Sequence, residues 1–300
     1  MEIILASKTK QAIEDAIEND QGASFRTFLK QILPKFEDPF RGVEKNLYRS
    51  HLGASVIGKE CDRSIWYGFR WFKKPSFSGR ITRLFNRGHL EEPRVLASLM
   101  TIGVKIYQQD ANGKQFRISD IGGHFGGSGD GVAIGIPDLP VDMPCLLEIK
   151  THSDKYFKEL VKQGVKLAKP EHYVQMQIYM NKMGLGVALY CAVNKNDDEY
   201  YFEIIWAEQI TPATMIERAR IIIMSSSPPQ KINNSPSWYQ CKCCDYQRIC
   251  HFGVEPERNC RTCHFSRPIE DGTWQCVNPI CPGTLSEEDQ LKGCSWHERK

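Results

Sequence analysis

A glutamate and a lysine stand two residues apart in the apolar run Leu146-Leu147-Glu148-Ile149-Lys150. Side chains on a β-strand alternate between its two faces, so Glu148 and Lys150 share one face while Leu147 and Ile149 turn toward a core. An isolated Glu-x-Lys pair is more often a solvated ion pair at a strand edge. The residues around this pair therefore decide what chemistry it can do.

An aspartate precedes this strand in the sequence Gly127-Ser128-Gly129-Asp130-Gly131, which is typical of a tight turn one hairpin upstream. Carboxylates that converge from neighbouring strands can hold Mg²⁺ or Mn²⁺ through oxygen ligands. Such a metal lowers the pKa of a bound water and polarises a phosphodiester. Lys150 would then position the attacking water or neutralise charge in the transition state.

Two further pairs have helical spacing. His89 and Glu92 stand three residues apart and should share a face of their helix. Glu92 is the better site candidate of two neighbouring acids, because Pro93 restricts it and it aligns with His89, whereas we expect Glu91 to be solvated. Gly88 should let this helix pack closely.

Gln175 and Tyr179 lie one helical turn apart downstream and should also share a face, although many helices carry such pairs.

The elements that must position these residues follow from periodicity and chain breakers. We expect strands at 145–150, 186–193 and 199–206, with a β-meander over 104–150. The expected helices cover 9–18, 24–33, 80–101, 154–168, 171–183 and 212–224.

The order of an acid on a helix, Asp130, Glu148-x-Lys150 and Gln175-x3-Tyr179 resembles the PD-(D/E)xK nucleases, and within them the RecB-like and viral exonuclease branch. The resemblance covers roughly residues 50–250. It implies an α/β fold with a restriction-endonuclease-like core, a central mixed sheet flanked by helices. It also implies metal ligation by Asp130, Glu148 and the Ile149 carbonyl. Gly129 stands where the family usually has proline.

The resemblance assigns the remaining roles by position: His89 or Glu92 would be an accessory ligand, Lys150 catalytic, and Gln175 would orient the site.

Nine of the twelve cysteines lie between Cys241 and Cys294, a clustering that favours metal ligation in a reducing compartment. Cys61, Cys241, Cys244 and Cys250 make one set of four thiolates, which suits iron–sulfur or zinc. The set resembles the iron–sulfur nucleases of the Cas4 and AddB type. That resemblance implies a [4Fe–4S] cluster closing a nuclease domain over residues 1–252, and leaves Cys243 as a substitute or a bystander.

The remaining residues, 253–300, are too few to build a stable core without a cross-link, and a structural zinc ion is the natural cross-link. We expect a zinc-ribbon-like, cysteine-rich module at the C-terminus. Its predicted ligands are Cys260, Cys263, Cys276 and Cys294, with Cys281 and His297 as rivals for the fourth position.

Composition sets wide limits: 41% apolar and 25% charged residues, with a net charge of +3, describe a globular protein and do not by themselves indicate nucleic-acid binding. Lysines recur at helical intervals just after the active strand, and beside a nuclease site they could follow phosphates: Lys155, Lys158, Lys162, Lys166 and Lys169. With no signal peptide or long apolar run in the sequence, we expect a cytoplasmic protein, in the host cytoplasm if a phage encodes it.

The leading hypothesis is a Mg²⁺- or Mn²⁺-dependent DNA exonuclease acting on single- or double-stranded ends, in phage-type recombination, repair or DNA processing. An annealing protein or a helicase could be its partner, and homo-oligomers are known among related exonucleases. The alternatives are a Cas4-like adaptor nuclease that trims DNA within a larger complex, and a DNA-binding protein without catalysis. The sequence leaves open the polarity, the strand preference, the oligomeric state and the choice between exonuclease and endonuclease.

Overall fold

The computed structural model describes residues 3–36, 48–110 and 112–300. The chain divides into two compact units. The first comprises Met1–Val43, Phe77–Ile118 and Ser128–Pro212, and the second comprises Glu44–Ser76, Ser119–Gly127 and Ala213–Lys300. Each unit is thus assembled from three separate stretches of chain, whereas the boundary predicted at residue 252 follows the sequence alone and stays a prediction.

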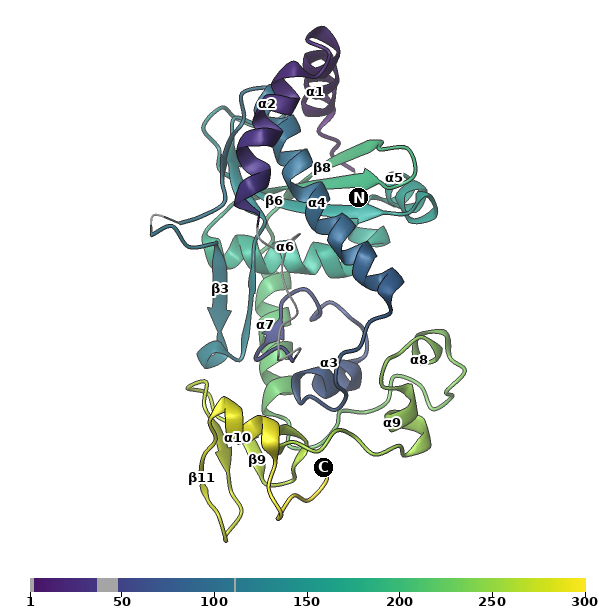
Figure 1. The fold of residues 1–300 in the computed structure, drawn as a ribbon, viewed down its shortest axis with the longest axis vertical. Helices are drawn as coiled ribbons and strands as arrows, with labels where there is room; N and C mark the ends of the chain where they lie inside the picture. The colour runs from purple at the N-terminus through teal and green to yellow at the C-terminus, as the bar shows by residue number, and fades with distance from the viewer. Residues whose placement is uncertain (1–2, 37–47, 111) are drawn as a thin grey trace. The chain divides into compact units, whose positions relative to one another are not determined.

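Helices make up much of both units (Figure 1). The α-helices are α1 (Ser7–Asn19), α2 (Ala23–Ile32), α3 (Asp62–Phe69), α4 (Gly79–Thr101), α5 (Asp154–Ala168), α6 (Pro170–Met183), α7 (Ile210–Met224), α8 (Tyr239–Lys242), α9 (Gln247–Phe252) and α10 (Glu287–Lys292). Short 3₁₀ turns are η1 (Leu33–Lys35), η3 (Ile121–Gly123) and η4 (Cys260–Thr262).

The strands form three sheets within the described residues. The strands are β1 (Leu52–Gly53), β2 (Lys105–Tyr107), β3 (Arg117–Asp120), β4 (Phe125–Ser128), β5 (Gly131–Ile134), β6 (Cys145–His152), β7 (Val187–Asn194), β8 (Tyr200–Trp206), β9 (Ser266–Pro268), β10 (Trp274–Cys276) and β11 (Gly283–Thr284). The largest sheet has the order β2-β5-β6-β7-β8, and the two small sheets have the orders β1-β4-β3 and β11-β10-β9.

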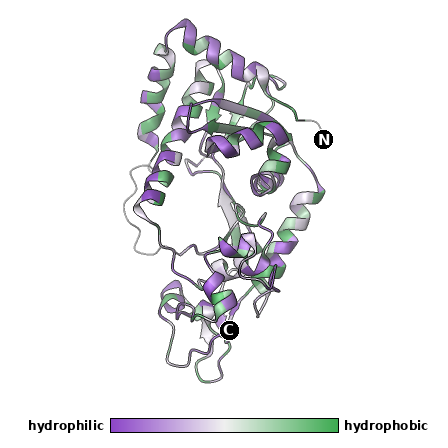
Figure 2. Cartoon of the chain, turned by 90° about the vertical axis from the view of Figure 1, so that its right-hand side faces the viewer, coloured by the Kyte–Doolittle hydropathy of each residue, from purple (hydrophilic) through white to green (hydrophobic). Residues whose placement is uncertain are grey.

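The five-stranded sheet is mixed, because β6 and β7 run parallel while the other neighbouring strands are antiparallel. One face of it is apolar: Leu147, Ile149 and Leu189 join a buried core with residues of α1, α2 and α4. Helices α5 and α6 contact β6 and β7 as well. The helices of this unit show hydrophobic and hydrophilic residues along the same element (Figure 2), as amphipathic packing requires.

The predicted helices and the strands predicted at 145–150, 186–193 and 199–206 are present, and the fold is the mixed α/β class expected from the sequence. The β-meander expected over 104–150 is wrong, because β2, β5 and β6 join one sheet while β3 and β4 join another. Two expectations about α4 were wrong. Glu91 is 4% exposed and pairs with Arg94 at 3.0 Å, so it is buried and not solvated. A Cβ atom added at Gly88 would meet nothing within 4 Å, so close packing does not explain that glycine.

The second unit contains two buried arginines whose hydrogen bonds go mainly to main-chain carbonyls. The Arg70 guanidinium donates to the Ser225 carbonyl at 3.0 Å, and Arg261 donates to the Phe69 carbonyl at 3.0 Å. Arg261 also stacks 3.7 Å from the ring centroid of Trp71. Burial lowers the pKa of Arg70 to about 9, and the charge of Arg267 adds to the effect. Burial likewise lowers the pKa of Arg261 to about 9, and the charge of Arg70 adds to that effect. Aromatic rings and carbonyl dipoles therefore stabilise these cations.

Candidate active site and cysteine groups

The turn before β5 brings Asp130 against the middle of β6. Gly131 pairs with Leu147, which sets the register of the two strands. Gly131 has a φ of 151°, and a Cβ there would lie 3.0 Å from the Tyr107 carbonyl oxygen, so glycine is needed directly after the aspartate. The Ile149 N–H donates a 2.8 Å hydrogen bond to Asp130 Oδ2. This bond fixes one carboxylate beside the strand that carries the other.

Glu148 is fully buried on β6 and meets two of the predicted site residues. Its Oε1 forms an ion pair with the Lys150 ammonium, and its Oε2 accepts a 3.1 Å hydrogen bond from Gln175 Nε2 on α6. Alternation along β6 puts the acid and the amine on one face, as expected, and the helix above contributes the amide. Strand register and one helix thus assemble Asp130, Glu148, Lys150 and Gln175.

The charges in this group are strongly coupled. Burial raises the pKa of Glu148 to about 7, Lys150 opposes the rise, and Asp130 adds to it. Burial alone would lower the pKa of Lys150, but the carboxylates of Glu148, Asp130 and Glu92 outweigh it, so its pKa is raised. Lys150 therefore stays an ammonium ion at physiological pH. Glu148 can lose its proton near neutral pH, and its carboxylate could then bind a cation.

The site residues predicted on α4 and α6 differ in solvent exposure. His89 Nδ1 is 3.8 Å from Glu92 Oε1 on α4, so these two side chains share a face. Glu92 is also one of the acids that act on Lys150. Tyr179 is 3% exposed on α6, one turn beyond Gln175.

The carboxylates fit a divalent cation. Glu148 Oε1 is paired with the Lys150 ammonium, Glu148 Oε2 accepts from Gln175, and a second acid, Asp130, acts on the same carboxyl. In the part of the chain that the structure describes, no group of three or more His, Cys, Asp or Glu side chains is arranged to hold a metal. Two carboxylates, a main-chain carbonyl and waters need no third acidic side chain, and such oxygen ligands suit Mg²⁺ or Mn²⁺.

Sequence reasoning missed three rings next to this group. His152 continues the Glu148 and Lys150 face of β6, Tyr190 pairs with Glu148 on β7, and His172 lies on α6 three residues before Gln175. His152 and His172 both lie within hydrogen-bond distance of the Tyr190 hydroxyl. The i+4 position from Glu148 on the strand was the signal that could have found the first of them.

The structure brings the first cysteine set together. Burial raises the pKa of Cys241, and the neighbouring thiols of Cys61 and Cys250 add to the rise. Burial likewise raises the pKa of Cys244, with the same two thiols contributing. Cys243 is exposed. The four predicted sulfurs are neighbours, although they are not arranged as a metal site among the described residues.

The second set is also gathered, within the second unit. Burial raises the pKa of Cys260 to about 11, and the thiols of Cys294, Cys263 and Cys276 add to the rise. Cys281 is hydrogen-bonded to Cys276 and Cys294, so five sulfurs lie near one another.

The remaining rival for this set, His297, points its Nε2 at the Thr262 hydroxyl, 3.0 Å away.

The lysines after β6 are only partly available to a ligand. Lys158 pairs with Asp154 at 2.9 Å, and Lys166 pairs with Glu208 at 2.6 Å. Lys155 and Lys162 are exposed. The predicted continuous lysine face is therefore interrupted by ion pairs.

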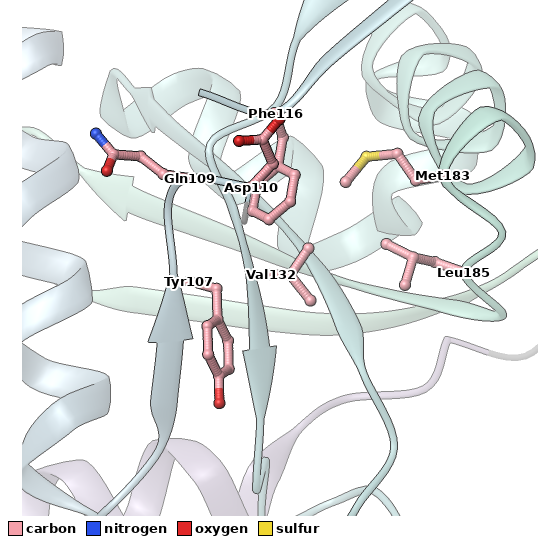
Figure 3. A pocket seen from close by; sticks show the side chains of 7 residues that line it. All are labelled: Tyr107, Gln109, Asp110, Phe116, Val132, Met183 and Leu185. Carbon is pink, nitrogen blue, oxygen red and sulfur yellow. The ribbon is translucent and has the colours of Figure 1, made fainter. Parts of the chain in front are cut away.

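A hollow of about 530 Å³ lies elsewhere in the first unit (Figure 3). Its lining is mostly apolar and contains none of the predicted site residues: Tyr107, Gln109, Asp110, Phe116, Val132, Met183 and Leu185. Asp130 and Glu148 do not line this hollow, so it is separate from the candidate active site.

No family model matches the chain, and the comparison with curated proteins found no match. The solved structures to which the chain is similar include three described next. LHK-Exo in complex with dAMP is 20% identical with a TM-score of 0.42, over 58% of this chain and 86% of that one. An alkaline exonuclease (LHK-Exo) from Laribacter hongkongensis is 18% identical with a TM-score of 0.43, over 58% and 87%. SSO0001 is 19% identical with a TM-score of 0.38, over 77% and 97%.

Identities this low and TM-scores below 0.5 describe a distant likeness, so the activity has to be argued from the residues themselves. None of the described helices is both long and apolar enough to cross a bilayer.

Proposed function

We propose that the protein is a metal-dependent deoxyribonuclease of the PD-(D/E)xK type that hydrolyses phosphodiester bonds from DNA ends. The observation that carries the proposal is the assembly of four side chains: Glu148 and Lys150 on β6, Gln175 on α6, and Asp130 in the turn before β5. A buried ion pair with a second acid beside it has no evident structural purpose, since apolar residues would stabilise a sheet centre at least as well. The resemblance stated for the sequence motifs points to the same activity.

The residues divide the work by their chemistry. Asp130, Glu148 and the Ile149 carbonyl would hold a divalent cation, with His89 or Glu92 as an accessory ligand. When bound, Mg²⁺ or Mn²⁺ would polarise the phosphodiester and lower the pKa of a water.

Lys150 would neutralise charge that develops on the phosphate, because its ammonium ion stays protonated. Gln175 would orient Glu148 through their hydrogen bond, and Tyr179 would support the same end of α6.

The cysteine groups would stabilise the chain and take no part in hydrolysis. We infer a [4Fe–4S] cluster on Cys61, Cys241, Cys244 and Cys250, and a zinc ion held by four of the five sulfurs near Cys260. Burial, and after it the neighbouring thiols, raises the pKa of Cys241 and of Cys260, and a bound cation would offset this rise and so couple metal binding to folding.

The test is cleavage of end-labelled single- and double-stranded linear DNA beside a closed circle. The protein is purified anaerobically and assayed with Mn²⁺ or with EDTA. We expect loss of linear DNA with Mn²⁺ only, and intact circles. Cutting of circles would change the assignment to an endonuclease. Binding without cleavage would overturn the catalytic proposal and leave a DNA-binding protein, and cleavage that appears only with added partner proteins would favour the adaptor nuclease.

A further inference from the structure

An arginine on α7 contacts the segment that carries Cys61. The Arg218 guanidinium donates to the main-chain carbonyls of Ile57 and Lys59, each at 2.6 Å. Its Nε also donates to Asp62 Oδ1 at 2.8 Å, and these two charged groups form an ion pair. Cys61 lies between these acceptors in the sequence, directly before the first residue of α3. One side chain therefore holds the chain on both sides of this cysteine.

Arg218 is partly sheltered from water. Its side chain is 22% exposed, and Ile57, whose carbonyl it meets, is fully buried. A guanidinium carries several N–H donors in a fixed planar fork, so it can bind several oxygens at once. Hydrogen bonds from a charged donor are roughly twice as strong as neutral ones. The segment 57–62 should therefore keep its place without a bound metal.

The other thiols of the first cysteine set lie on a segment with short helices. Cys241 lies on α8, which has 4 residues, and Cys250 lies on α9, which has 6 residues. Helices this short have little stability of their own. An exposed hydrogen bond of 2.6 Å, from Gln240 Nε2 to Glu60 Oε2, joins the chain neighbours of Cys241 and Cys61. The segment 241–250 thus lies beside Cys61, but water competes for the bond that joins them.

We propose that Arg218 is a positioning residue for the metal centre of the first cysteine set, an inference that rests on the cluster in the proposed function. Arg218 holds the Cys61 thiol in place before a cation binds. The thiols of the segment 241–250 take their final positions when the centre is loaded. Bringing ligands together that are so far apart in the sequence costs chain entropy, and a fixed Cys61 leaves less of that cost to metal binding.

The first readout needs no metal. Amide hydrogen exchange over residues 57–62 is compared in the metal-free full chain of wild type, Arg218→Ala and Arg220→Ala. Arg220 is the matched control on α7, because its ion pairs go to Glu217 and to Glu270. We expect exchange over 57–62 to be about tenfold faster in Arg218→Ala, since charged hydrogen bonds to this segment are lost, and unchanged in Arg220→Ala.

The second readout follows the loaded centre without using nuclease activity. Each protein is reconstituted anaerobically with ferrous iron and sulfide, and the bound iron, the visible absorbance of the cluster and the rate of iron loss to a chelator are measured. Residues that orient metal ligands typically contribute about 10- to 100-fold to metal affinity, so Arg218→Ala should lose iron about tenfold faster than wild type. Arg218→Lys keeps a charge beside Asp62 and should recover part of this difference.

The outcomes separate the positioning role from the cluster and from the nuclease function. Wild-type hydrogen exchange and iron retention in Arg218→Ala would overturn the positioning role alone. If Arg218→Ala does not fold, Arg218→Lys decides: it should lose iron faster than wild type, and an equal rate would overturn the role. A wild-type protein that takes up no iron would overturn the cluster and the positioning role with it, and cleavage of linear DNA by that protein would leave the nuclease function standing.

Discussion

The pair of acids, Asp130 and Glu148, and the two cysteine groups are positioned in different ways. Glu148 lies on a continuous sheet, where the pairing of β5, β6 and β7 fixes its position, and Asp130 lies in the turn that enters β5 and accepts from a main-chain N–H of β6. The cysteines lie on short helices, turns and short strands. Acids on a sheet can be held ready before any metal binds, whereas neighbouring thiols need a cation to complete their surroundings. The first region should thus keep its shape without metal and the second should not.

Of the substitutions that test this comparison, removal of the Lys150 amine should have the largest effect. Lys150→Ala should lower single-turnover cleavage by about 10³-fold or more, because a preorganised charge in a buried site is a large part of such catalysis. The free energy of unfolding should also fall, because buried Glu148 loses its ion-pair partner, and Mn²⁺ should still bind. Lys105→Ala, an exposed lysine on β2, is the control and should cleave as wild type does. Retained cleavage in Lys150→Ala would mean that another group does this work.

The second region can be tested at its buried cations. Arg261→Ala should lower the free energy of unfolding by about 3 kcal/mol, because it leaves a cavity between rings and removes donors from the Phe69 carbonyl and Gln290. Arg261→Met should cost less, since it refills the space and relieves repulsion from Arg70. Chemical denaturation measures both. An Arg261→Ala protein as stable as wild type would contradict the account of how this unit is held.

The pH dependence of Mn²⁺ binding tests the role of Glu148 in the pair of acids. The pKa of Glu148 is raised to about 7, so its neutral form is favoured below that pH and its carboxylate above it. Metal needs the carboxylate, and Mn²⁺ affinity should therefore be about tenfold weaker at pH 6 than at pH 8. Titration with Mn²⁺ at the two pH values measures this, and Glu148→Gln should abolish the difference. Equal affinities in the wild type would show that Glu148 is not a ligand.

The smallest expected effect concerns acid stability. The pKa values of His152 and His172 are depressed in the folded protein, so the unfolded chain binds protons first as pH falls below about 6.5. Stability from these two rings is present above pH 6.5 and is lost toward pH 4. His152→Gln should flatten that part of the curve, as followed by thermal unfolding between pH 7 and pH 4. An unchanged curve would mean that the rings gain protons in the folded state.

The sequence could predict much of the first unit, because strand alternation is a local rule. The Glu148 and Lys150 face and the Gln175 helix follow from periodicities of two and 3.6 residues. Tyr190 could not be placed in this way, since its proximity to Glu148 depends on pairing between strands about forty residues apart. Glu91 was misjudged because burial of a charge depends on Arg94 and on tertiary packing.

In the second unit, the sequence predicted which cysteines cluster, but not the arginine and aromatic packing that holds the unit together.

Cleavage should require a cation that is held by Asp130 and Glu148. The most direct measurement is Mn²⁺ occupancy and cleavage of linear DNA on the same samples, for wild type and for Asp130→Asn, which keeps the size of the side chain. We predict that cleavage by the wild type rises in proportion to bound Mn²⁺, and that Asp130→Asn loses both together. Cleavage by Asp130→Asn at the wild-type rate, or cleavage by the wild type in EDTA, would contradict the claim.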